Sequence, residues 1–523
     1  MDRNSGMLTD RQIHLSLLIT IMVSFILLFL QYFVFDCPLR TISNSDIYQH
    51  MACILEISKG MIPPNNPITT SSAPDVHYGP YLVVLGYVYR FTQIDVITLL
   101  CIAGLINLPL FIFFSFQFIK EKLGKEVALF SIISMLYVWG IWGHYAGIYK
   151  IFISQNQFYP QGIAYTLLFA SLCCLTRAER DRKYMLFAII LSVLLFTTHL
   201  LTGVLYLVLI FLLLLSDLYK TRTFNIKYHC FLICLPVLTF LLSLLWPFYS
   251  VLEAFQPHSV QQVSGTIGDI IIQVNSSTII IPEKYSSNFL LSWVHIFTNY
   301  YHYGVMHYPV VGGLACFGLI ELYHLVRKKR LFFPLWFIFC FLMVIGPISF
   351  SHRFFLFSLI PLHIGFGIIL YKFFKENTSK NFIYLMIGIL LLSVITTGVV
   401  EFALYYREPP PNYDFIFNNT EQDSVILSDI QTSWKIPALT GRKVIYGLHG
   451  CGFPENQSER KNALITFYDS NTTIEEQSNI IKKYNISYIL VDHKIKQNIF
   501  SYPINYQDDQ FTLYNCKRLN FYV

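Results

Sequence analysis

The sequence predicts a polytopic α-helical membrane protein that ends in a small α/β domain. Of the 523 residues, 54% are hydrophobic and only 13% are charged, whereas a soluble domain usually carries about 25% charged residues. Long uncharged runs such as Ile189–Leu215 and Phe382–Val400 recur along the chain, and each is long enough to cross a bilayer as a helix. From Arg407 onward the composition becomes polar, which predicts a final domain outside the bilayer.

Eleven apolar segments of the sequence are predicted to span the membrane. They are Ile13–Phe35, Ile94–Phe118, Val127–Gly143, Pro160–Leu175, Tyr184–Thr198, Leu201–Leu218, Tyr228–Ser250, Val305–His324, Leu331–Ser349, Phe354–Tyr371 and Phe382–Leu404. The first is too long for a cleavable signal peptide and is followed by no small-residue cleavage site, so it is expected to remain as an anchor. Another apolar stretch, Gly79–Phe91, is too short to cross and is predicted to be a half-buried or re-entrant helix.

Basic residues set the predicted orientation. Lys and Arg gather in the N-terminal segment and in the links Lys120–Glu126, Arg177–Lys183, Lys220–Lys227, Arg327–Arg330 and Lys372–Lys380. Because positively charged links stay in the cytoplasm, the N-terminus is predicted to be cytoplasmic and the C-terminal domain extracytoplasmic. We therefore expect a membrane module over residues 1–404, with its first outer loop at 36–81, and an extracytoplasmic α/β domain over 405–523.

The C-terminal domain begins after a stiff break of three prolines at 409–411. Strands are predicted at Ser424–Leu427, Lys443–Tyr446 and Ile486–Val491, and helices at Thr432–Leu439 and Thr473–Tyr484. The last residues are predicted to form a hairpin between Phe511–Tyr514 and Arg518–Val523. Short strands that alternate with helices predict a compact α/β domain.

The first outer loop contains most of the ionisable residues that could do chemistry: Asp46, His50, Glu56, Asp75 and His77. Ser43–Ser58 is predicted to form a helix, which places Asp46 and His50, four residues apart, on one face. A carboxylate beside an imidazole can transfer protons or hold a cation, although a capped amphipathic helix with ordinary surface charges would have the same pattern. Few ionisable groups interrupt the spans, which argues against an ion-coupled transporter.

Six short motifs, together with the order of the segments, indicate a family. They are SNSDIYQH at Ser43–His50, KGMIPPNNP at Lys59–Pro67, HYGPY at His77–Tyr81, THLLTG at Thr198–Gly203, SHRFFLFSLIPL at Ser351–Leu362 and SDIQTSWKIPALTGRKVIYG at Ser428–Gly447. The order along the chain is one span, a long outer loop, many further spans and an outer C-terminal domain. In this layout the chain resembles the membrane glycosyltransferases of the GT-C superfamily, which include protein O-mannosyltransferases, the aminoarabinose transferase of lipid A and the catalytic subunit of oligosaccharyltransferase.

The resemblance implies an enzyme of the cell membrane that transfers a hexosyl or pentosyl group. Such enzymes take the sugar from a polyprenyl-phosphate donor and pass it to a glycan, lipid or protein acceptor on the outer side. The family places a carboxylate in the first outer loop, where this sequence has Asp46, with His50 one helical turn away. A base there would take the proton from the acceptor hydroxyl. No nucleic-acid-binding motif is present, so nucleic acid is not an expected partner.

Five further residues are expected to bind substrate: Arg353, His199, His77, Tyr78 and Glu56. Arg353 begins a span at an outer turn and could offer two N–H donors to the donor phosphate, or it could anchor the helix end. His199 lies at a tight outer turn, where it could contact the phosphate or sugar, or could be a buried histidine without such a role. His77 and Tyr78 could line the acceptor groove or form the turn before the short helix, and Glu56 is a second-choice carboxylate.

No metal site is expected in this chain. Metal-using relatives have a second acidic motif in a later outer loop, whereas the corresponding segment His144–Gln161 contains no Asp or Glu. Asp46 with His50 is a small ligand set, so a reaction without a divalent metal is favoured over one that needs it.

Two functions of other classes remain open. A flippase or transporter for lipid-linked sugars would need polar groups along the spans, and the spans supply few. A non-catalytic envelope assembly protein would use the membrane part as an anchor, for which a long loop with Asp46 and His50 is unnecessary. Replacing Asp46 would separate both from a transferase.

Overall fold

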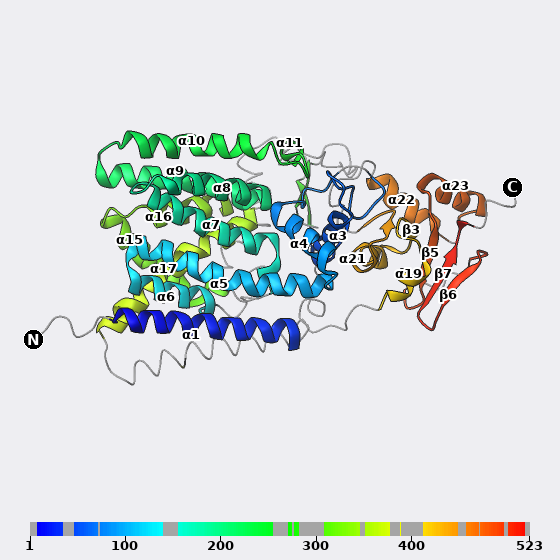
Figure 1. Cartoon of the computed structure of the whole chain (residues 1–523), viewed down its shortest axis with the longest axis horizontal. Helices are drawn as coiled ribbons and strands as arrows, with labels where there is room; N and C mark the ends of the chain where they lie inside the picture. The colour runs from blue at the N-terminus through cyan, green and yellow to red at the C-terminus, as the bar shows by residue number, and fades with distance from the viewer. Residues whose placement is uncertain are drawn as a thin grey trace, which may run out of the picture.

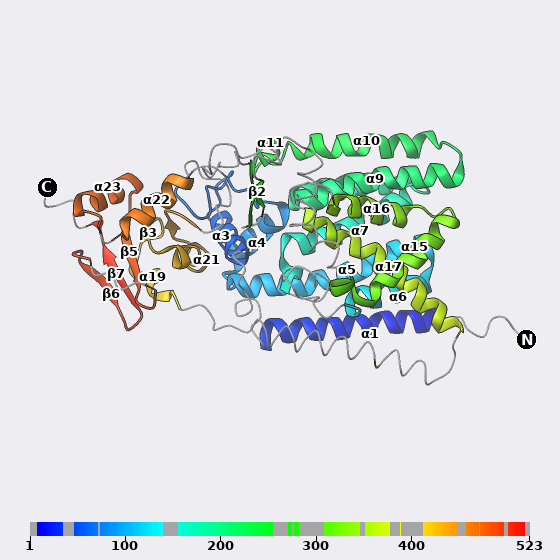
Figure 2. The same cartoon turned by 180° about the vertical axis from the view of Figure 1, so that it is seen from behind.

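The molecule consists of a bundle of helices and a five-stranded sheet covered by shorter helices, with the segment 46–79 between them (Figure 1). The view from behind shows the same order (Figure 2). The computed structural model describes residues 8–34, 46–71, 74–139, 155–254, 270–274, 277–281, 308–345, 351–376, 388, 412–447, 457–469, 471–495 and 500–517.

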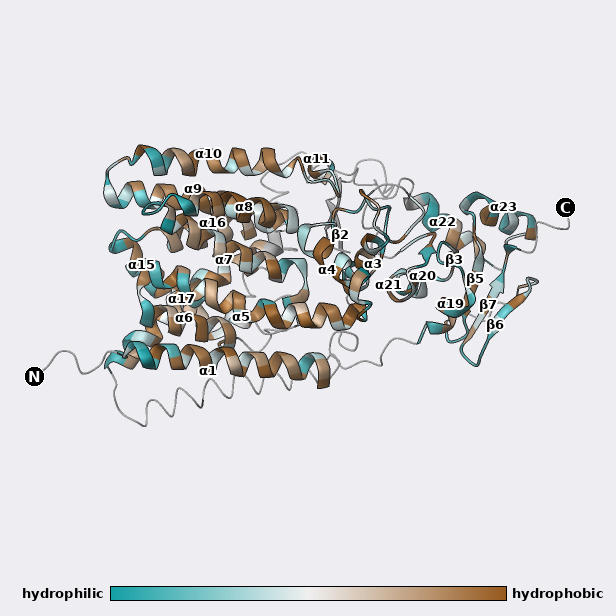
Figure 3. Ribbon diagram, viewed as in Figure 1, coloured by the Kyte–Doolittle hydropathy of each residue, from teal (hydrophilic) through white to brown (hydrophobic). Residues whose placement is uncertain are grey.

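The long helices of the bundle run side by side, and most of their surface is hydrophobic (Figure 3). They are α1 (Asp10–Phe29), α5 (Val96–Leu123), α6 (Lys125–Tyr137), α7 (Pro160–Ala178), α8 (Lys183–Thr198), α9 (Leu200–Thr221), α10 (Ile226–Ser243), α15 (Gly318–Arg327), α16 (Phe332–Ile345) and α17 (Ser351–Glu376). Short elements join them: η1 (Leu30–Val34), η2 (Gln155–Phe158), α11 (Val251–Ala254), η4 (Tyr308–Gly312), η5 (Gly313–Phe317) and the antiparallel pair β1 (Ile270–Val274) and β2 (Ser277–Ile281).

Apolar helices of spanning length identify an integral membrane protein. Within the described ranges, five stretches are long and apolar enough to cross a membrane: Asp10–Val34, Val96–Leu123, Leu200–Thr221, Ile226–Ser243 and Phe354–Glu376. The segment predicted to be too short to cross forms α4 (Pro80–Thr92). The predicted span at Phe382–Leu404 lies outside the described residues, apart from residue 388.

Local sequence explains how the helices around the segment 46–79 begin. Pro80 and Pro160 occupy the first turns of α4 and α7, where a fixed φ suits the helix and the missing N–H costs no hydrogen bond. His199 ends α8 and is also the N-cap of α9, in an extended conformation. Gly79 allows the 46–79 segment to rest on the end of α8, because a Cβ there would lie 2.7 Å from the carbonyl oxygen of Thr197.

The sheet has the strand order β4-β3-β5-β7-β6. Its strands are β3 (Val425–Leu427), β4 (Lys443–Val444), β5 (Tyr488–Asp492), β6 (Ile504–Gln507) and β7 (Phe511–Asn515). β3 pairs in parallel with β4 and β5, whereas β7 runs antiparallel to β5 and β6. The predicted hairpin of Phe511–Tyr514 with 518–523 involves residues outside the described ones. Among those described, β7 pairs with β5 on one edge and with β6 on the other.

Alternate residues of the central strands face two apolar layers, as the strand period requires. Leu427, Ile489 and Val491 pack with residues of α22 (Gln457–Phe467) and α23 (Ile474–Tyr484). Ile426 and Leu490 pack on the other face, with residues of α19 (Asp414–Asn419) and α21 (Lys435–Thr440). A one-turn helix, α20 (Ile430–Ser433), precedes α21. Both faces of the sheet are thus covered.

The segment 46–79 is fastened to the sheet by a backbone bond and a buried ion pair. The N–H of Val444 in β4 donates to the carbonyl of Ile68 at 2.9 Å. Lys443 Nζ lies 2.7 Å from Glu56 Oε2 and also donates to the carbonyl of Asn66. Burial lowers the pKa of Lys443 to about 8, an effect that Glu56 partly offsets. The helix α3 (Asp46–Ser58) is thereby held against the sheet part.

Candidate active site

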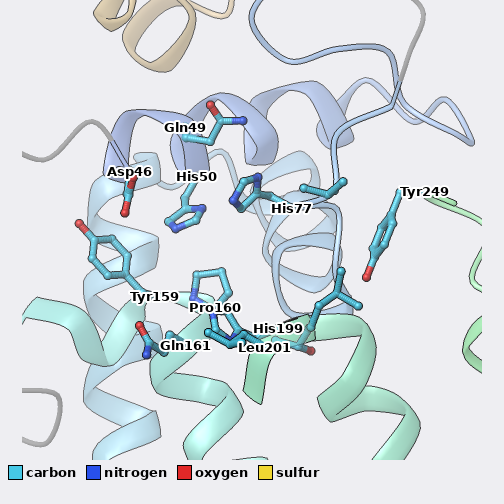
Figure 4. A pocket seen from close by; sticks show the side chains of 13 residues that line it. Asp46, Gln49, His50, His77, Tyr159, Pro160, Gln161, His199, Leu201 and Tyr249 are labelled. Carbon is cyan, nitrogen blue, oxygen red and sulfur yellow. The ribbon is translucent and has the colours of Figure 1, made fainter. Parts of the chain in front are cut away.

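A cavity of about 260 Å³ lies at the end of the bundle that faces the sheet (Figure 4). Four parts of the chain build it: the first turns of α3, the loop before α4, the start of α7 and the turn between α8 and α9. A tyrosine after α10 completes the wall. The lining residues are Asp46, Gln49, His50, Val76, His77, Tyr159, Pro160, Gln161, Thr198, His199, Leu200, Leu201 and Tyr249.

Two helix N-termini face this pocket. α7 begins at Pro160 and α9 at Leu200, and both residues line the cavity. The first N–H groups of a helix have no partner within the helix and carry partial positive charge. An anion such as a phosphate is therefore favoured at this position.

His199 presents one ring nitrogen to its own helix. Its Nδ1 accepts the backbone N–H of Thr202 at 3.2 Å and lies 2.7 Å from the Thr202 hydroxyl. A neutral ring whose Nδ1 is an acceptor carries its proton on Nε2. The capping bond thus makes the other edge of the His199 ring a hydrogen-bond donor.

A network of three polar side chains joins α3 to the loop before α4. Asp75 accepts hydrogen bonds from Gln49 Nε2 at 2.5 Å, from the His77 N–H at 2.8 Å and from His77 Nδ1 at 2.6 Å. Asp75 is fully buried, whereas the His77 side chain is 34% exposed and lines the pocket. The buried Asp75 carboxylate thus fixes the orientation of the His77 ring that lines the pocket.

Within the part of the chain that the structure describes, several buried polar atoms on the pocket wall have no hydrogen-bond partner: Gln49 Oε1, His50 Nδ1, the Tyr159 hydroxyl, Gln161 Nε2 and the Thr198 hydroxyl. Buried polar groups in folded proteins are nearly always hydrogen-bonded, since leaving one unpaired costs about 1–3 kcal/mol. Five such atoms line this one cavity, so a polar ligand bound there could supply their missing hydrogen bonds.

The pocket keeps two of its titratable groups neutral. Burial holds the pKa of His50 well below its usual range, and the neighbouring rings of His77 and His199 lower it further. Burial raises the pKa of Tyr159, and Asp46 adds to the shift. The rings of His50 and His77 lie 5.5 Å apart and those of His50 and Tyr159 lie 5.2 Å apart. His50 is thus a neutral imidazole packed between two other rings at pH 7.

Of the residues proposed from the sequence, the structure brings Asp46, His50, His77 and His199 to this one pocket. Asp46 is in the first turn of α3 and is half-buried. The spacing of four residues between Asp46 and His50 does place both on the pocket side of α3 (Figure 4).

Two other proposed residues do not line the pocket. Glu56 lies further along α3 in the ion pair with Lys443, because its buried carboxylate needs a charged partner. Tyr78 is fully buried; its hydroxyl donates to the carbonyl of Asn65 at 2.5 Å, and its own carbonyl accepts the Trp246 indole N–H at 2.8 Å. Both are structural contacts of the 46–79 segment. The side chain of Arg353, near the start of α17, lies outside the described residues.

The pocket wall also contains four polar residues that were not predicted from the sequence: Gln49, Tyr159, Gln161 and Thr198. Gln49 could have been found, because it stands three residues after Asp46 and so lies on the same helix face. Gln161 follows the proline that starts α7, which also predicts a place at the helix end. The other two have no signal in the sequence by itself.

The described residues of the pocket do not form a metal-ligand set. Over the described parts of the chain, no three His, Cys, Asp or Glu side chains come together as a metal would need. The imidazole nearest to a carboxylate, His77, uses its Nδ1 to hold Asp75.

Comparisons with known proteins bear on the fold. No protein-family model matches the chain and no curated protein sequence does. Solved structures do match. The oligosaccharyltransferase of Archaeoglobus fulgidus in its apo form is 13% identical with a TM-score of 0.56, and the match covers 92% of this chain and 70% of that one. The same organism's AglB, in complex with an inhibitory peptide and a dolichol-phosphate, is 13% identical with a TM-score of 0.58, over 92% and 69% of the two chains.

A third structure matches over almost the full length of both proteins. ArnT from Cupriavidus metallidurans, bound to undecaprenyl phosphate, is 12% identical with a TM-score of 0.52, over 95% of this chain and 97% of that chain. At such low identity, structural likeness establishes the fold and does not establish the activity. The expectation from the six motifs is confirmed at the level of the fold, which this chain shares with these solved structures.

Proposed function

We propose that this protein is a membrane glycosyltransferase that moves a hexosyl or pentosyl group from a polyprenyl-phosphate donor to a glycan, lipid or protein acceptor. One observation carries the proposal. A carboxylate, Asp46, and the N-termini of α7 and α9 face the same small pocket at one end of an apolar bundle. A lipid-linked phosphate can reach such a place from the bilayer, and an acceptor can reach it from the aqueous side.

The proposed reaction is a displacement at the anomeric carbon of the sugar. Asp46 takes the proton of the acceptor hydroxyl as its oxygen bonds to the anomeric carbon. The bond between that carbon and the phosphate oxygen breaks, and its electron pair remains on the polyprenyl phosphate. The negative charge that grows on the phosphate is met by the ends of α7 and α9 and by N–H donors of His199 and His77. Arg353 stays in the proposal as a further phosphate ligand. His50 is a neutral neighbour of the reacting groups.

The proposal includes a location and an orientation. We propose eleven spans in the cell membrane from the apolar segments, and the distribution of Lys and Arg supports a cytoplasmic N-terminus and an extracytoplasmic sheet domain. The dolichol-phosphate and undecaprenyl phosphate bound in structures of the same fold support a polyprenyl-phosphate donor. We also propose that transfer needs no divalent metal, because the described pocket residues supply no ligand set.

The test is sugar transfer from radiolabelled polyprenyl-phosphate sugars by membranes that carry wild-type protein or Asp46→Asn at matched expression. Loss of a general base costs about 10²–10⁴-fold in rate, so we expect Asp46→Asn to be nearly inactive and Arg353→Ala to be impaired. Asp95→Asn is the matched control, because Asp95 is the N-cap of α5 and does not line the pocket. Equal transfer by all four proteins, or none with any donor, would favour a flippase or an assembly protein instead.

A further inference from the structure

Behind the pocket wall, the buried carboxylate of Asp75 contacts the imidazole of His77, which lines the pocket. Asp75 is fully buried, and each of its oxygens accepts at least one hydrogen bond. Oδ2 accepts from Gln49, and Oδ1 accepts from both the backbone and the ring of His77. Asp75 is absent from the pocket wall, so it acts on a ligand through the groups that it holds.

The ring of His77 connects Asp75 to the pocket. Nδ1 lies 2.6 Å from Asp75 Oδ1, so Nδ1 donates and Nε2 is on the opposite edge of the ring. That ring lines the cavity beside His50 (Figure 4). A carboxylate in direct contact favours the charged form of an imidazole. The protonated ring then has a second N–H, at Nε2, to offer to a ligand.

A positive charge on His77 is important for binding an anion because of the other residues that line the pocket. The described residues that line it include no Lys or Arg. The titratable groups that face His77 are Asp46 and His50 from α3, Tyr159 before α7, His199 before α9, and Tyr249. His50 and Tyr159 are held neutral, as described above. Of the three lining histidines, His77 is the one whose ring contacts a carboxylate within the described chain.

We propose that Asp75 is a positioning residue that keeps His77 protonated, so that His77 Nε2–H binds an oxygen of the donor phosphate and the site loses affinity for this phosphate as the pH rises. The inference rests on the proposed function, which supplies the phosphate. His77 keeps its proton throughout the reaction. Its hydrogen bond becomes stronger as the sugar leaves, because the phosphate then gains negative charge.

The experiment measures binding of a polyprenyl monophosphate to the full-length protein in nanodiscs between pH 6 and 9, with sugar transfer assayed in parallel. Ionisation of the lipid is common to all variants, so differences between variants belong to the protein. Wild type should bind more weakly as the pH rises. In Asp75→Asn the pH at which affinity for the lipid falls should be lower than in wild type by about one unit or more. At the lowest pH of the series, Asp75→Asn should bind nearly as well as wild type. His77→Gln should bind about tenfold or more weakly at pH 6 and show no such loss.

Asp95→Asn is the control, since it removes a carboxylate that also accepts a backbone N–H, that of Thr98, but lies away from the pocket. Two results would overturn the inference: a loss of affinity in Asp75→Asn by the same factor at every pH, or a wild-type pH dependence that persists in His77→Gln. The expected binding pattern without any sugar transfer would support the role of Asp75 and His77 and would overturn the proposed function alone.

Discussion

Helix α3 presents uncharged polar groups toward the pocket and an ion-paired carboxylate toward the sheet. Toward the pocket, Gln49 Oε1 and His50 Nδ1 have no hydrogen-bond partner among the described residues. Toward the sheet, Oε2 of Glu56 lies 2.8 Å from Lys59 Nζ and 2.7 Å from Lys443 Nζ, while its Oε1 has no partner among the same residues. Unpaired buried polar atoms cost stability and are expected where a ligand binds, whereas paired charges hold two parts of a chain together. The ion pair therefore marks the sheet side of α3 as the supporting side, and the cavity marks the other side as the one where a ligand would bind.

The largest expected effect is on the supporting side. Lys443→Met leaves the buried Glu56 with Lys59 as its remaining cation, and breaking a buried pair costs about 3–5 kcal/mol. We expect the unfolding free energy to fall by about 3 kcal/mol, the lower end, because Lys59 remains. Thermal unfolding and protease resistance of the sheet part measure this, while the rate of transfer per folded molecule should change little.

Two controls sharpen that result. Lys517→Met removes the partner of Glu421, whose side chain is 61% exposed, so it should cost less than about 1 kcal/mol. Adding Glu56→Gln to Lys443→Met removes the uncompensated charge, and the double variant should therefore lose less stability than the sum of the single variants. Additive losses, or a Lys443→Met variant as stable as wild type, would contradict the supporting role.

A smaller effect is expected on the pocket side, and on activity instead of stability. Thr198→Val removes a buried hydroxyl that has no partner among the described residues, so stability should change by less than about 1 kcal/mol. If that hydroxyl binds the substrate, transfer should fall about tenfold. Thr239→Val is the matched control, because its hydroxyl is also buried and unpaired but lies in α10, off the pocket wall. Initial rates at matched expression decide the matter. If Thr198→Val and Thr239→Val transfer sugar at equal rates, the unpaired Thr198 hydroxyl does not bind the substrate.

The smallest expected effect is that of metal removal. Since the described pocket residues form no metal-ligand set, treatment of the membranes with EDTA should change the rate of transfer by less than about twofold. The assay is repeated after addition of Mg²⁺ or Mn²⁺. A loss of activity with EDTA that either ion restores would show that the pocket side holds a metal, and the mechanism proposed for Asp46 would then need revision.

Parts of the fold with strong local patterns were predictable. The apolar run at α9 and the amphipathic pattern at α23 each determine a helix, because both signals are contained within one element. β5 is buried on both faces and was found from its apolar sequence. β6 was missed because Ile504–Gln507 is largely exposed and alternates weakly. The pairing of β6 with β7 was missed as well, since a strand pattern does not say which strands pair with each other.

Some features of the candidate site were likewise predictable from local sequence, and others were not. The helical spacing of Asp46 and His50 was sufficient to place both on one face, and the break at His199 was sufficient to place it at a helix end. The bond between Gln49 and Asp75 joins a helix to a loop 26 residues later. Its existence depends on how the loop folds back, which no local pattern records.

By itself, then, the sequence determined an integral membrane protein with apolar helices, a polar loop that carries Asp46 and His50, and strands β3 and β5. Only the tertiary structure decided that Glu56 supports the fold, through Lys443 at a separation of 387 residues, and that Asp75 stands behind His77. The physical reason is that a buried charge acts according to its partner. For side chains distant in sequence, that partner is selected by packing of the whole chain.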